Sequence, residues 1–181
     1  MEITATAIPD VKLITPRVFG DDRGFFMESW HAGKFAEAGI TATFVQDNHS
    51  RSAKAVLRGL HYQQPGAQGK LVRVVRGAVF DVAVDLRQSS ATFGQWVGAE
   101  LSAANRAMLW VPPGFAHGFL TLADDTDFLY KCTAAYAPEH EQCLAWDDRD
   151  IGVVWPDIGM APVLSGKDQQ GRAFADCVTF P

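Results

Sequence analysis

A histidine directly follows a rigid turn in the segment Pro112–His117, which reads PPGFAH. Proline fixes φ and glycine permits a tight bend, so this turn can direct His117 toward the interior. Another histidine, His61, and a lysine, Lys70, stand earlier in the chain. An imidazole of ordinary pKa (~6.5) suits proton transfer near neutral pH, and an ammonium can stabilise an oxyanion on a substrate carbonyl. We predict that these three side chains converge on one polar site.

The spacing P-x-G-x-x-H resembles the second motif of the cupins, small jelly-roll barrels that often hold a metal ion. The first cupin motif has H-x-H, then a glutamate, then a glycine seven positions later. The matching stretch here is His61-Tyr62-Gln63, then Lys70, then Gly77. An ammonium cannot ligate a cation and repels one. We therefore predict that the protein binds no metal, and that Lys70 supplies a fixed positive charge in its place.

Taken singly, these residues have ordinary explanations, a strand histidine and a lysine at the rim of a barrel. Their convergence with His117 in the mouth of a barrel favours a functional site. In that site Lys70 would stabilise an oxyanion and His61 would be free to act as a general base.

Alternating apolar residues predict the strands that hold these groups. Two β-branched runs, Leu71–Arg76 and Ala78–Leu86, are joined at a glycine turn, Gly77. In the second run, Val82, Val84 and Leu86 share one face, and Asp81, Ala83 and Asp85 share the other. This period of two predicts a half-buried strand.

Further short strands are expected at Gln95–Leu101, Ala107–Val111, Gly118–Leu122, Asp127–Thr133 and Cys143–Trp146. One helix is expected at Ala32–Gly39, after Ser29, and the Gly- and Pro-rich tail Trp155–Pro181 is expected to wrap the surface. Short strands that follow one another in this way, with turn residues between them, are typical of sandwiches and barrels. We predict one all-β domain, residues 1–181, with the cupin-type jelly-roll barrel and a few short helices.

Composition narrows the class of protein further. The chain has 181 residues, of which 48% are hydrophobic and 20% charged, as in folded globular proteins. Sixteen Lys and Arg against twenty-one Asp and Glu give a net charge of −5, which argues against nucleic acid as a partner. The amino terminus lacks the pattern of a signal peptide and no long apolar run predicts a membrane span, so we expect a cytoplasmic protein.

Cys132, Cys143 and Cys177 are odd in number and lie far apart in the chain. No pair has C-x-x-C spacing, so the sequence predicts neither a zinc site nor a disulfide framework. Reduced, mostly packed thiols agree with the cytoplasm.

Several longer motifs occur together and in a fixed order along almost the whole chain. They are Val18–Glu28 (VFGDDRGFFME), Phe44–Ser50 (FVQDNHS), Leu57–Gln63 (LRGLHYQ), Gln68–Arg73 (QGKLVR), Thr92–Gly98 (TFGQWVG), Pro113–Phe119 (PGFAHGF), Leu129–Thr133 (LYKCT) and Leu164–Asp168 (LSGKD). This set resembles the dTDP-4-dehydrorhamnose 3,5-epimerase family.

The resemblance implies a substrate, dTDP-4-keto-6-deoxyglucose, epimerised at C3 and C5 during dTDP-L-rhamnose synthesis. The C4 ketone acidifies the protons on both neighbouring carbons, so no cofactor is needed. By analogy with the family, His61 is the base, Asp168 holds its ring, Lys70 faces the C4 oxygen and Tyr130 is the acid. The resemblance also implies a homodimer.

The family pattern assigns a larger set of residues to the nucleotide and sugar. Arginine forks suit the diphosphate, amides suit the thymine edge, and an aromatic ring stacks on the base. The matching positions are Arg23, Glu28, Gln46, Asp47, Asn48, Arg58, Lys70, His117, Tyr136, Glu141 and Lys167. The pattern departs at Ala134 and Ala135, where the family commonly has a polar residue and a tyrosine before the tyrosine matched by Tyr136.

Three other functions compete with this one. A 3- or 5-monoepimerase acting on a related dTDP-4-keto sugar would share most of the motifs. A non-catalytic sugar-nucleotide-binding cupin would need no acid and base, so His61, Tyr130 and Asp168 argue against it. A metal-dependent cupin oxygenase or isomerase is disfavoured by Gln63 and Lys70.

Overall fold

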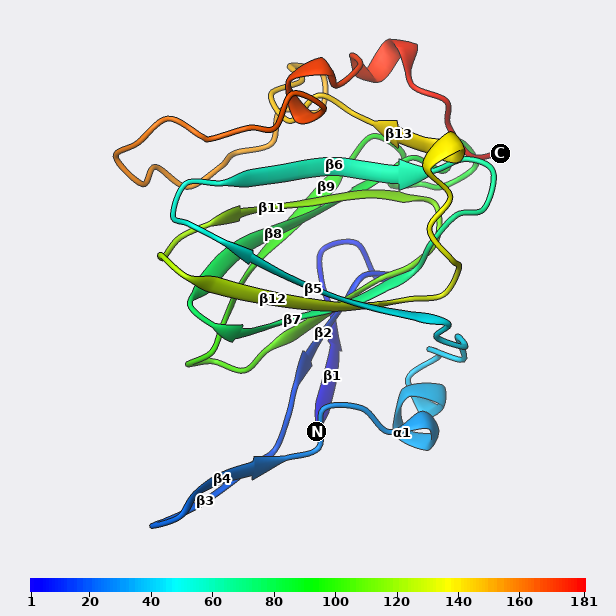
Figure 1. Cartoon of the computed structure of the whole chain (residues 1–181). Helices are drawn as coiled ribbons and strands as arrows, with labels where there is room; N and C mark the ends of the chain where they lie inside the picture. Colours follow the sequence, from blue (N-terminus) through cyan, green and yellow to red (C-terminus); the bar gives the residue numbers. More distant parts are fainter.

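Two antiparallel sheets face each other in the computed structural model, which describes all residues from Met1 to Pro181 (Figure 1). In spatial order, the six-stranded sheet contains β1 (Glu2–Ala5), β2 (Lys12–Thr15), β10 (Met108–Val111), β7 (Lys70–Arg76), β12 (Thr126–Cys132) and β5 (Gln46–Ser52). The five-stranded sheet contains β13 (Glu141–Cys143), β6 (Leu57–Gln63), β11 (Phe115–Thr121), β8 (Ala78–Asp85) and β9 (Trp96–Ser102). The fold is the predicted all-β, cupin-type jelly roll.

Apolar side chains from both sheets fill much of the space between them. Val72 and Val74 of β7 meet Val79 and Ala83 of β8 in one cluster of buried residues. Phe119 of β11 and Phe128 of β12 stack across this space, with ring centroids 4.1 Å apart. Burying this apolar surface holds the two sheets together.

The two predicted runs around Gly77 form β7 and β8, but they lie in different sheets. Gly77 has φ of +78°, and a side chain there would collide with Thr126, so glycine suits this crossing between sheets. The prediction that β8 is half-buried is wrong, because Asp81 and Asp85 are as fully buried as the valines between them.

The carboxyl-terminal tail explains why β8 is covered on both faces. In Figure 1 the tail runs over the five-stranded sheet on the side away from the other sheet. Its Trp155, Phe174 and Phe180 belong to one apolar cluster with Val82 and Val84 of β8. The tail therefore wraps the surface, as expected. It contains two short 3₁₀ helices, η2 (Asp168–Gln170) and η3 (Phe174–Asp176).

The expected helix forms as α1 (Ala32–Glu37), and Phe35 is its one buried residue. His31, rather than Ser29, caps it, since its Nδ1 accepts a hydrogen bond from the Lys34 backbone amide at 3.3 Å. A third 3₁₀ helix, η1 (Pro138–His140), precedes β13. None of the helices is long and apolar enough to cross a membrane.

The expected strand near Cys143 is displaced, because β13 ends at Cys143 instead of beginning there. The other expected strands form within three residues of their predicted starts. The sequence analysis missed β1 to β6, including β3 (Val18–Asp21) and β4 (Gly24–Met27), which pair only with each other.

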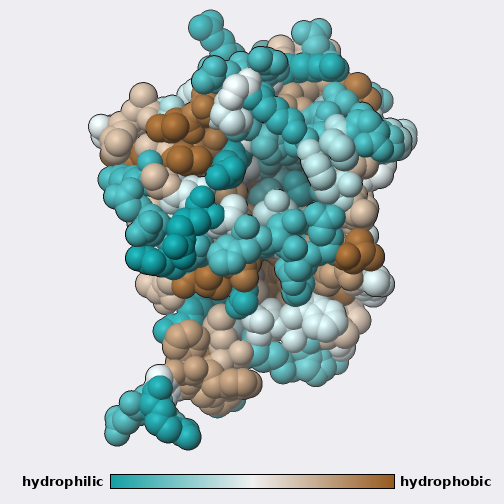
Figure 2. Space-filling view, in the orientation of Figure 1, coloured by the Kyte–Doolittle hydropathy of each residue, from teal (hydrophilic) through white to brown (hydrophobic).

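The β3–β4 hairpin projects from the body of the molecule (Figure 1). Phe19, Phe25 and Phe26 on this hairpin are 50%, 60% and 70% exposed. Figure 2 shows apolar residues along the projection and hydrophilic residues at its tip. Such a patch on a projecting hairpin is typical of a surface that another protein covers.

Candidate active site

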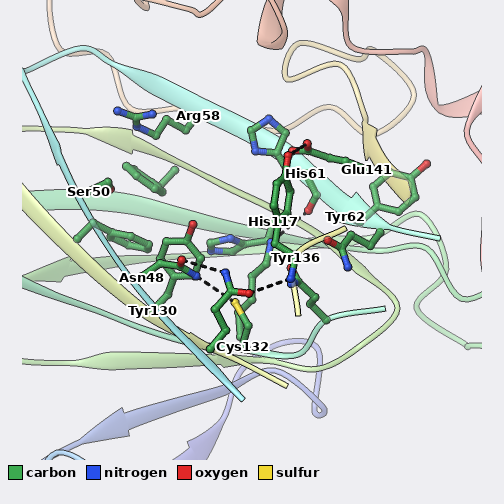
Figure 3. A pocket seen from close by; sticks show the side chains of 16 residues that line it. Asn48, Ser50, Arg58, His61, Tyr62, His117, Tyr130, Cys132, Tyr136 and Glu141 are labelled. Atoms are coloured by element: carbon green, nitrogen blue, oxygen red, sulfur yellow. Dashed lines mark hydrogen bonds between the residues drawn. The ribbon is translucent and has the colours of Figure 1, made fainter. Parts of the chain in front are cut away.

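A cavity of about 330 Å³ opens between the two sheets (Figure 3). The six-stranded sheet contributes β5, β7 and β12 to its walls, and the five-stranded sheet contributes β6, β11 and β13. Nine of the predicted site residues line it: Gln46, Asn48, Arg58, His61, Lys70, His117, Tyr130, Tyr136 and Glu141.

Strand alternation explains which side chains reach the cavity. On β5, Gln46, Asn48 and Ser50 face it, and on β12 so do Phe128, Tyr130 and Cys132. Residues two apart on a strand share a face, so each strand presents a row of side chains to the space between the sheets.

His61 of β6 contacts Asp168 of η2, as the family pattern predicts. Its Nε2 lies 2.7 Å from the Asp168 Oδ1, although this oxygen lies off the direction of a good ring hydrogen bond, so Nε2 is buried without a well-directed partner. The carboxylate itself is held firmly, because the Ser165 hydroxyl donates to Oδ2 at 2.6 Å and the Gly59 amide donates to Oδ1 at 3.1 Å. Burial alone would raise the pKa of Asp168, but His61 and these donors lower it to about 2.

Two glycines allow the strands to approach at this point. A Cβ on Gly59, which has φ of +120°, would lie 2.6 Å from the Cα of Gly118 on β11. The close approach accompanies an irregularity in the β6–β11 pairing, where His61 lies opposite His117. Both histidines are thereby placed on the same wall of the cavity.

Lys70 brings a cation into the cavity, as predicted. The residue is only 8% exposed, and its Nζ donates to the His61 carbonyl at 3.5 Å. Burial lowers the pKa of Lys70, and the nearby Cys132, Asp81 and Glu141 oppose that shift.

His117 is directed inward, as its turn predicts, and pairs with a carboxylate that the sequence analysis did not assign to the site. Its Nε2 lies 2.9 Å from the Asp81 Oδ1. Asp81 is fully buried, and this burial raises the pKa of its carboxyl while His117 and Lys70 oppose the rise.

Tyr130 stands on the wall opposite His61, since β12 and β6 belong to different sheets. Its ring packs beside Phe128, with centroids 5.9 Å apart, and its hydroxyl makes no hydrogen bond within the protein. Burial and the neighbouring Cys132 raise the pKa of Tyr130, so the hydroxyl keeps its proton at neutral pH.

Three residues of the family pattern meet at the edge of the cavity. The Tyr136 hydroxyl donates to the Glu141 Oε2 at 2.6 Å, and the Lys167 ammonium contacts the same oxygen. Burial would raise the pKa of Glu141, but Lys167 and Tyr136 lower it below its ordinary value. Lys167 therefore lies beside the cavity without lining it.

Three glutamine side chains fix the backbone that carries Tyr136. Gln63, only 3% exposed, accepts from the Ala137 amide at 2.9 Å and donates to the Ala135 carbonyl at 3.2 Å. Gln46 accepts from the Tyr136 amide at 2.8 Å, and Gln68 donates to the Ala134 carbonyl at 2.8 Å. These bonds reach the backbone, so they do not depend on the side chains of Ala134 and Ala135, where the chain departs from the family pattern.

Three predicted binding residues do not reach this cavity within the chain. Arg23 lies at the tip of the β3–β4 hairpin and pairs with Asp21, and Glu28 pairs with Lys34. Asp47 alternates to the outer face of β5 and pairs with Lys131 at 2.5 Å.

The sequence analysis missed several residues that line the cavity: Ser50, Tyr62, Gln68, Phe119, Phe128 and Cys132. It discussed Gln63 only as a lost metal ligand. Strand alternation around Asn48 and Tyr130 would have indicated Ser50, Phe128 and Cys132.

The residues at the cupin metal positions do not fit a metal ion. Lys70 places an ammonium there, both polar atoms of the Gln63 amide bond to backbone, and the Nε2 of His117 contacts Asp81. We assign no step of the chemistry to a metal at that position.

Comparison with known proteins identifies the family of the chain. The sequence profile of the dTDP-4-dehydrorhamnose 3,5-epimerase family matches residues 5–176. The dTDP-4-dehydrorhamnose 3,5-epimerase of Pseudomonas aeruginosa is 60% identical over 182 residues, which cover 100% of both chains.

Solved structures of similar proteins agree with these sequence matches. A dTDP-6-deoxy-D-glucose-3,5-epimerase from Legionella pneumophila, in complex with dTDP-4-keto-L-rhamnose, matches with a TM-score of 0.93 and 50% identity, covering 97% of this chain and 93% of that one. A 3'-monoepimerase from Streptomyces bikiniensis, in complex with dTDP-quinovose, matches with a TM-score of 0.88 and 32% identity over 95% of this chain and 87% of that one. The fold, the cavity and these similarities together show that the chain belongs to the dTDP-4-dehydrorhamnose 3,5-epimerase family.

Proposed function

We propose that the protein epimerises dTDP-4-keto-6-deoxy-D-glucose at C3 and C5, giving dTDP-4-keto-L-rhamnose. Membership of the family supports the substrate and the reaction. The observation that carries the mechanism is the placement of His61 and Tyr130 on opposing walls of one cavity. Epimerisation removes a proton from one face of a carbon and returns one to the other face, which requires an acid and a base on opposite sides.

In this mechanism His61 takes the proton from the carbon beside the C4 ketone. Because its Nε2 is buried against Asp168, Nδ1 is the nitrogen available to accept it. Asp168 then stabilises the imidazolium. The electron pair of the broken C–H bond forms an enolate, whose oxygen is stabilised by the Lys70 ammonium. The Tyr130 hydroxyl protonates the opposite face of the carbon. It regains its proton from water, and the His61 imidazolium releases its own proton to water, so both residues return to their starting states.

The nucleotide binds toward the edge of the cavity in this proposal. Tyr136, held by the glutamine side chains, stacks on the thymine, while Arg58 and Lys167 bind the diphosphate. Gln46 and Asn48, which line the cavity on β5, supply amides that can form hydrogen bonds with the nucleotide. No redox cofactor is required, because the ketone itself acidifies both carbons.

The test is incubation with dTDP-4-keto-6-deoxyglucose in deuterated water, with exchange at C3 and C5 read by NMR. Deuterium at both carbons, with the L-rhamno product, is expected. Exchange at one carbon only would instead identify a monoepimerase, the activity named for the S. bikiniensis protein. Binding of the substrate without exchange would leave a non-catalytic sugar-nucleotide-binding cupin.

We also propose that the protein works as a homodimer in which the β3–β4 hairpin of one copy reaches the cavity of the other. The exposed phenylalanines of the hairpin need a covering surface. Arg23 and Glu28, which the family pattern assigns to the substrate, do not line the cavity of their own chain. Exchange of the hairpin would bring them to the site, and C2 symmetry would complete both sites equally.

Two inactive variants test this exchange. Arg23→Ala and His61→Ala should each lose activity, but their co-expression should restore up to about a quarter of the wild-type activity, since half of the dimers are mixed and each has one intact site. No restoration would place Arg23 and His61 of one chain in the same site and overturn the exchange.

A cytoplasmic location is proposed for the same protein. Its support is the set of three free thiols, Cys132, Cys143 and Cys177, which suits a reducing compartment. Fractionation of the native host's cells would test it.

A further inference from the structure

Cys143 adds a thiol to the contact between His61 and Asp168. Strand β13 pairs with β6 so that Cys143 lies directly opposite His61, and η2 brings Asp168 to the same place. The His61 imidazole, the Cys143 thiol and the Asp168 carboxylate offer ligand atoms that all lie within 4.8 Å of one another. This cluster lies on the Asp168 side of His61 and does not use Gln63, Lys70 or His117.

The donors of this cluster make few strong hydrogen bonds apart from those that hold Asp168. His61 Nε2 is buried without a well-directed hydrogen bond. Cys143 makes only a weak contact, in which its Sγ donates to the Leu144 carbonyl at 3.6 Å. The third donor is already oriented, since Ser165 and Gly59 hold the Asp168 carboxylate. Supporting hydrogen bonds of this kind are typical of metal ligands.

We propose that His61, Cys143 and Asp168 form an inhibitory site for Zn²⁺. One nitrogen, one sulfur and one oxygen ligand match the preferences of zinc, with typical bond lengths of about 2.0–2.3 Å, and water would complete a tetrahedron. The side chains must adjust to bind the ion, because the donor atoms lie within 4.8 Å of one another and His61 Nε2 must separate from the Asp168 Oδ1 that it now contacts at 2.7 Å. The thiol releases its proton as the Zn–S bond forms, so the two anionic ligands neutralise the charge of the ion.

Zinc at this site stops the proposed reaction directly. The ion occupies His61 Nε2 and draws Asp168 away from its role as the partner of the imidazolium. A zinc-bound imidazole is a much poorer base, so the C–H proton is no longer removed. This consequence rests on the proposed function, whereas the binding of zinc does not.

A competition titration with a chromophoric zinc chelator, using the untagged and reduced full chain, measures the binding. The wild-type protein should withdraw one equivalent of zinc. Cys143→Ser should bind it at least ~10-fold more weakly, since losing a ligand costs no less than losing a residue that only supports one. Cys177→Ser is the matched control, because Cys177 is also a half-buried free cysteine but lies outside the cluster, and it should bind like the wild type.

Activity assays then separate the two proposals. Without zinc, Cys143→Ser and the wild type should epimerise at similar rates. The zinc concentration that inhibits the wild type should be at least ~10-fold lower than the concentration that inhibits Cys143→Ser. Absence of epimerisation in the zinc-free wild type would reject the proposed function but leave the chelator result intact. Equal zinc affinity in the wild type and Cys143→Ser would overturn the site, and Cys143→Ala provides a second variant if the serine protein does not fold.

Discussion

The Nε2 of His117 lies 2.9 Å from the Oδ1 of Asp81, which is fully buried on the neighbouring strand. Asp81 also opposes the effect of burial on Lys70, whose pKa is lowered overall. The proposed enolate therefore forms beside a buried lysine whose charged form is favoured by Cys132 and by a carboxylate in the wall behind it.

Asp81→Asn is expected to shift the alkaline limb of the kcat–pH profile to lower pH. Removing a negative charge lowers the pKa of Lys70 further, so its ammonium is lost earlier as the pH rises. The measurement is kcat between pH 6 and about 10. Lys70→Arg is the control, because its guanidinium stays charged and should move the limb to higher pH. An unchanged limb in Asp81→Asn would show that Asp81 does not maintain the charge of Lys70.

Lys70→Met removes the charge and keeps much of the side-chain volume. If the ammonium stabilises the enolate, kcat should fall by roughly 10²–10³ while KM changes little, the behaviour of a preorganised oxyanion-stabilising group. Steady-state kinetics with dTDP affinity in parallel would check this. A steep rise in KM with kcat unchanged would mean that Lys70 only binds the ground state.

His61→Ala should abolish deuterium incorporation at both carbons. General-base catalysis contributes ~10²–10⁴-fold, so a loss at least this large is expected, with dTDP binding largely retained. Exchange rates and dTDP affinity provide the measurement. A rate within about threefold of wild type would correspond to less than ~1 kcal/mol of barrier and would contradict the role of His61 as base.

Tyr130→Phe removes a hydroxyl that makes no hydrogen bond within the protein, so the melting temperature should change little. The variant can still form the enolate but returns the proton to the opposite face poorly. Solvent exchange at the substrate carbons should therefore outlast net epimerisation. Equal loss of both processes would favour a positioning role for Tyr130 over its role as the acid.

Gln63→Leu should loosen the loop that carries Tyr136 without touching the acid and the base. The Gln63 side-chain amide makes two hydrogen bonds to this loop, donating to the Ala135 carbonyl and accepting from the Ala137 amide, and it also donates to the Gly66 carbonyl. Losing them should weaken dTDP binding by about tenfold, or ~1.4 kcal/mol, and raise KM with kcat nearly unchanged. Gln68→Leu, which removes one bond to the same loop, should have a smaller effect. Equal KM values for Gln63→Leu and the wild type, in a folded variant, would contradict this positioning role.

Sequence patterns predicted the strands best where an apolar row faces the core. The strands β7 to β12 have such rows and were found. Strand β5, QDNHSRS, was missed because its inward row faces a polar cavity, so its residues do not alternate in hydrophobicity. Strand β6 was missed because Gly59, with its positive φ, interrupts the alternation.

The residues of the site also differ in how far the sequence alone could predict them. His61, Lys70 and His117 were recognisable from their chemistry and local motifs, whereas Tyr130 and Asp168 depended on the family resemblance. The sequence placed Asp81 on the exposed face of a half-buried strand, because nothing near it in the chain indicates His117 or the covering sheets. A pairing between strands that lie far apart in the chain, here β8 and β11, arises from the tertiary structure alone.

The tail that covers the five-stranded sheet also carries Asp168, whose carboxylate accepts from the Gly59 amide 109 residues earlier in the chain. Contacts between residues so distant in sequence close large loops and form slowly during folding. A chain whose sheets have assembled but whose tail has not docked would have a base without its partner. Catalytic competence in this protein is thus a property of the completed fold, and recovery of activity during refolding reports the docking of the tail.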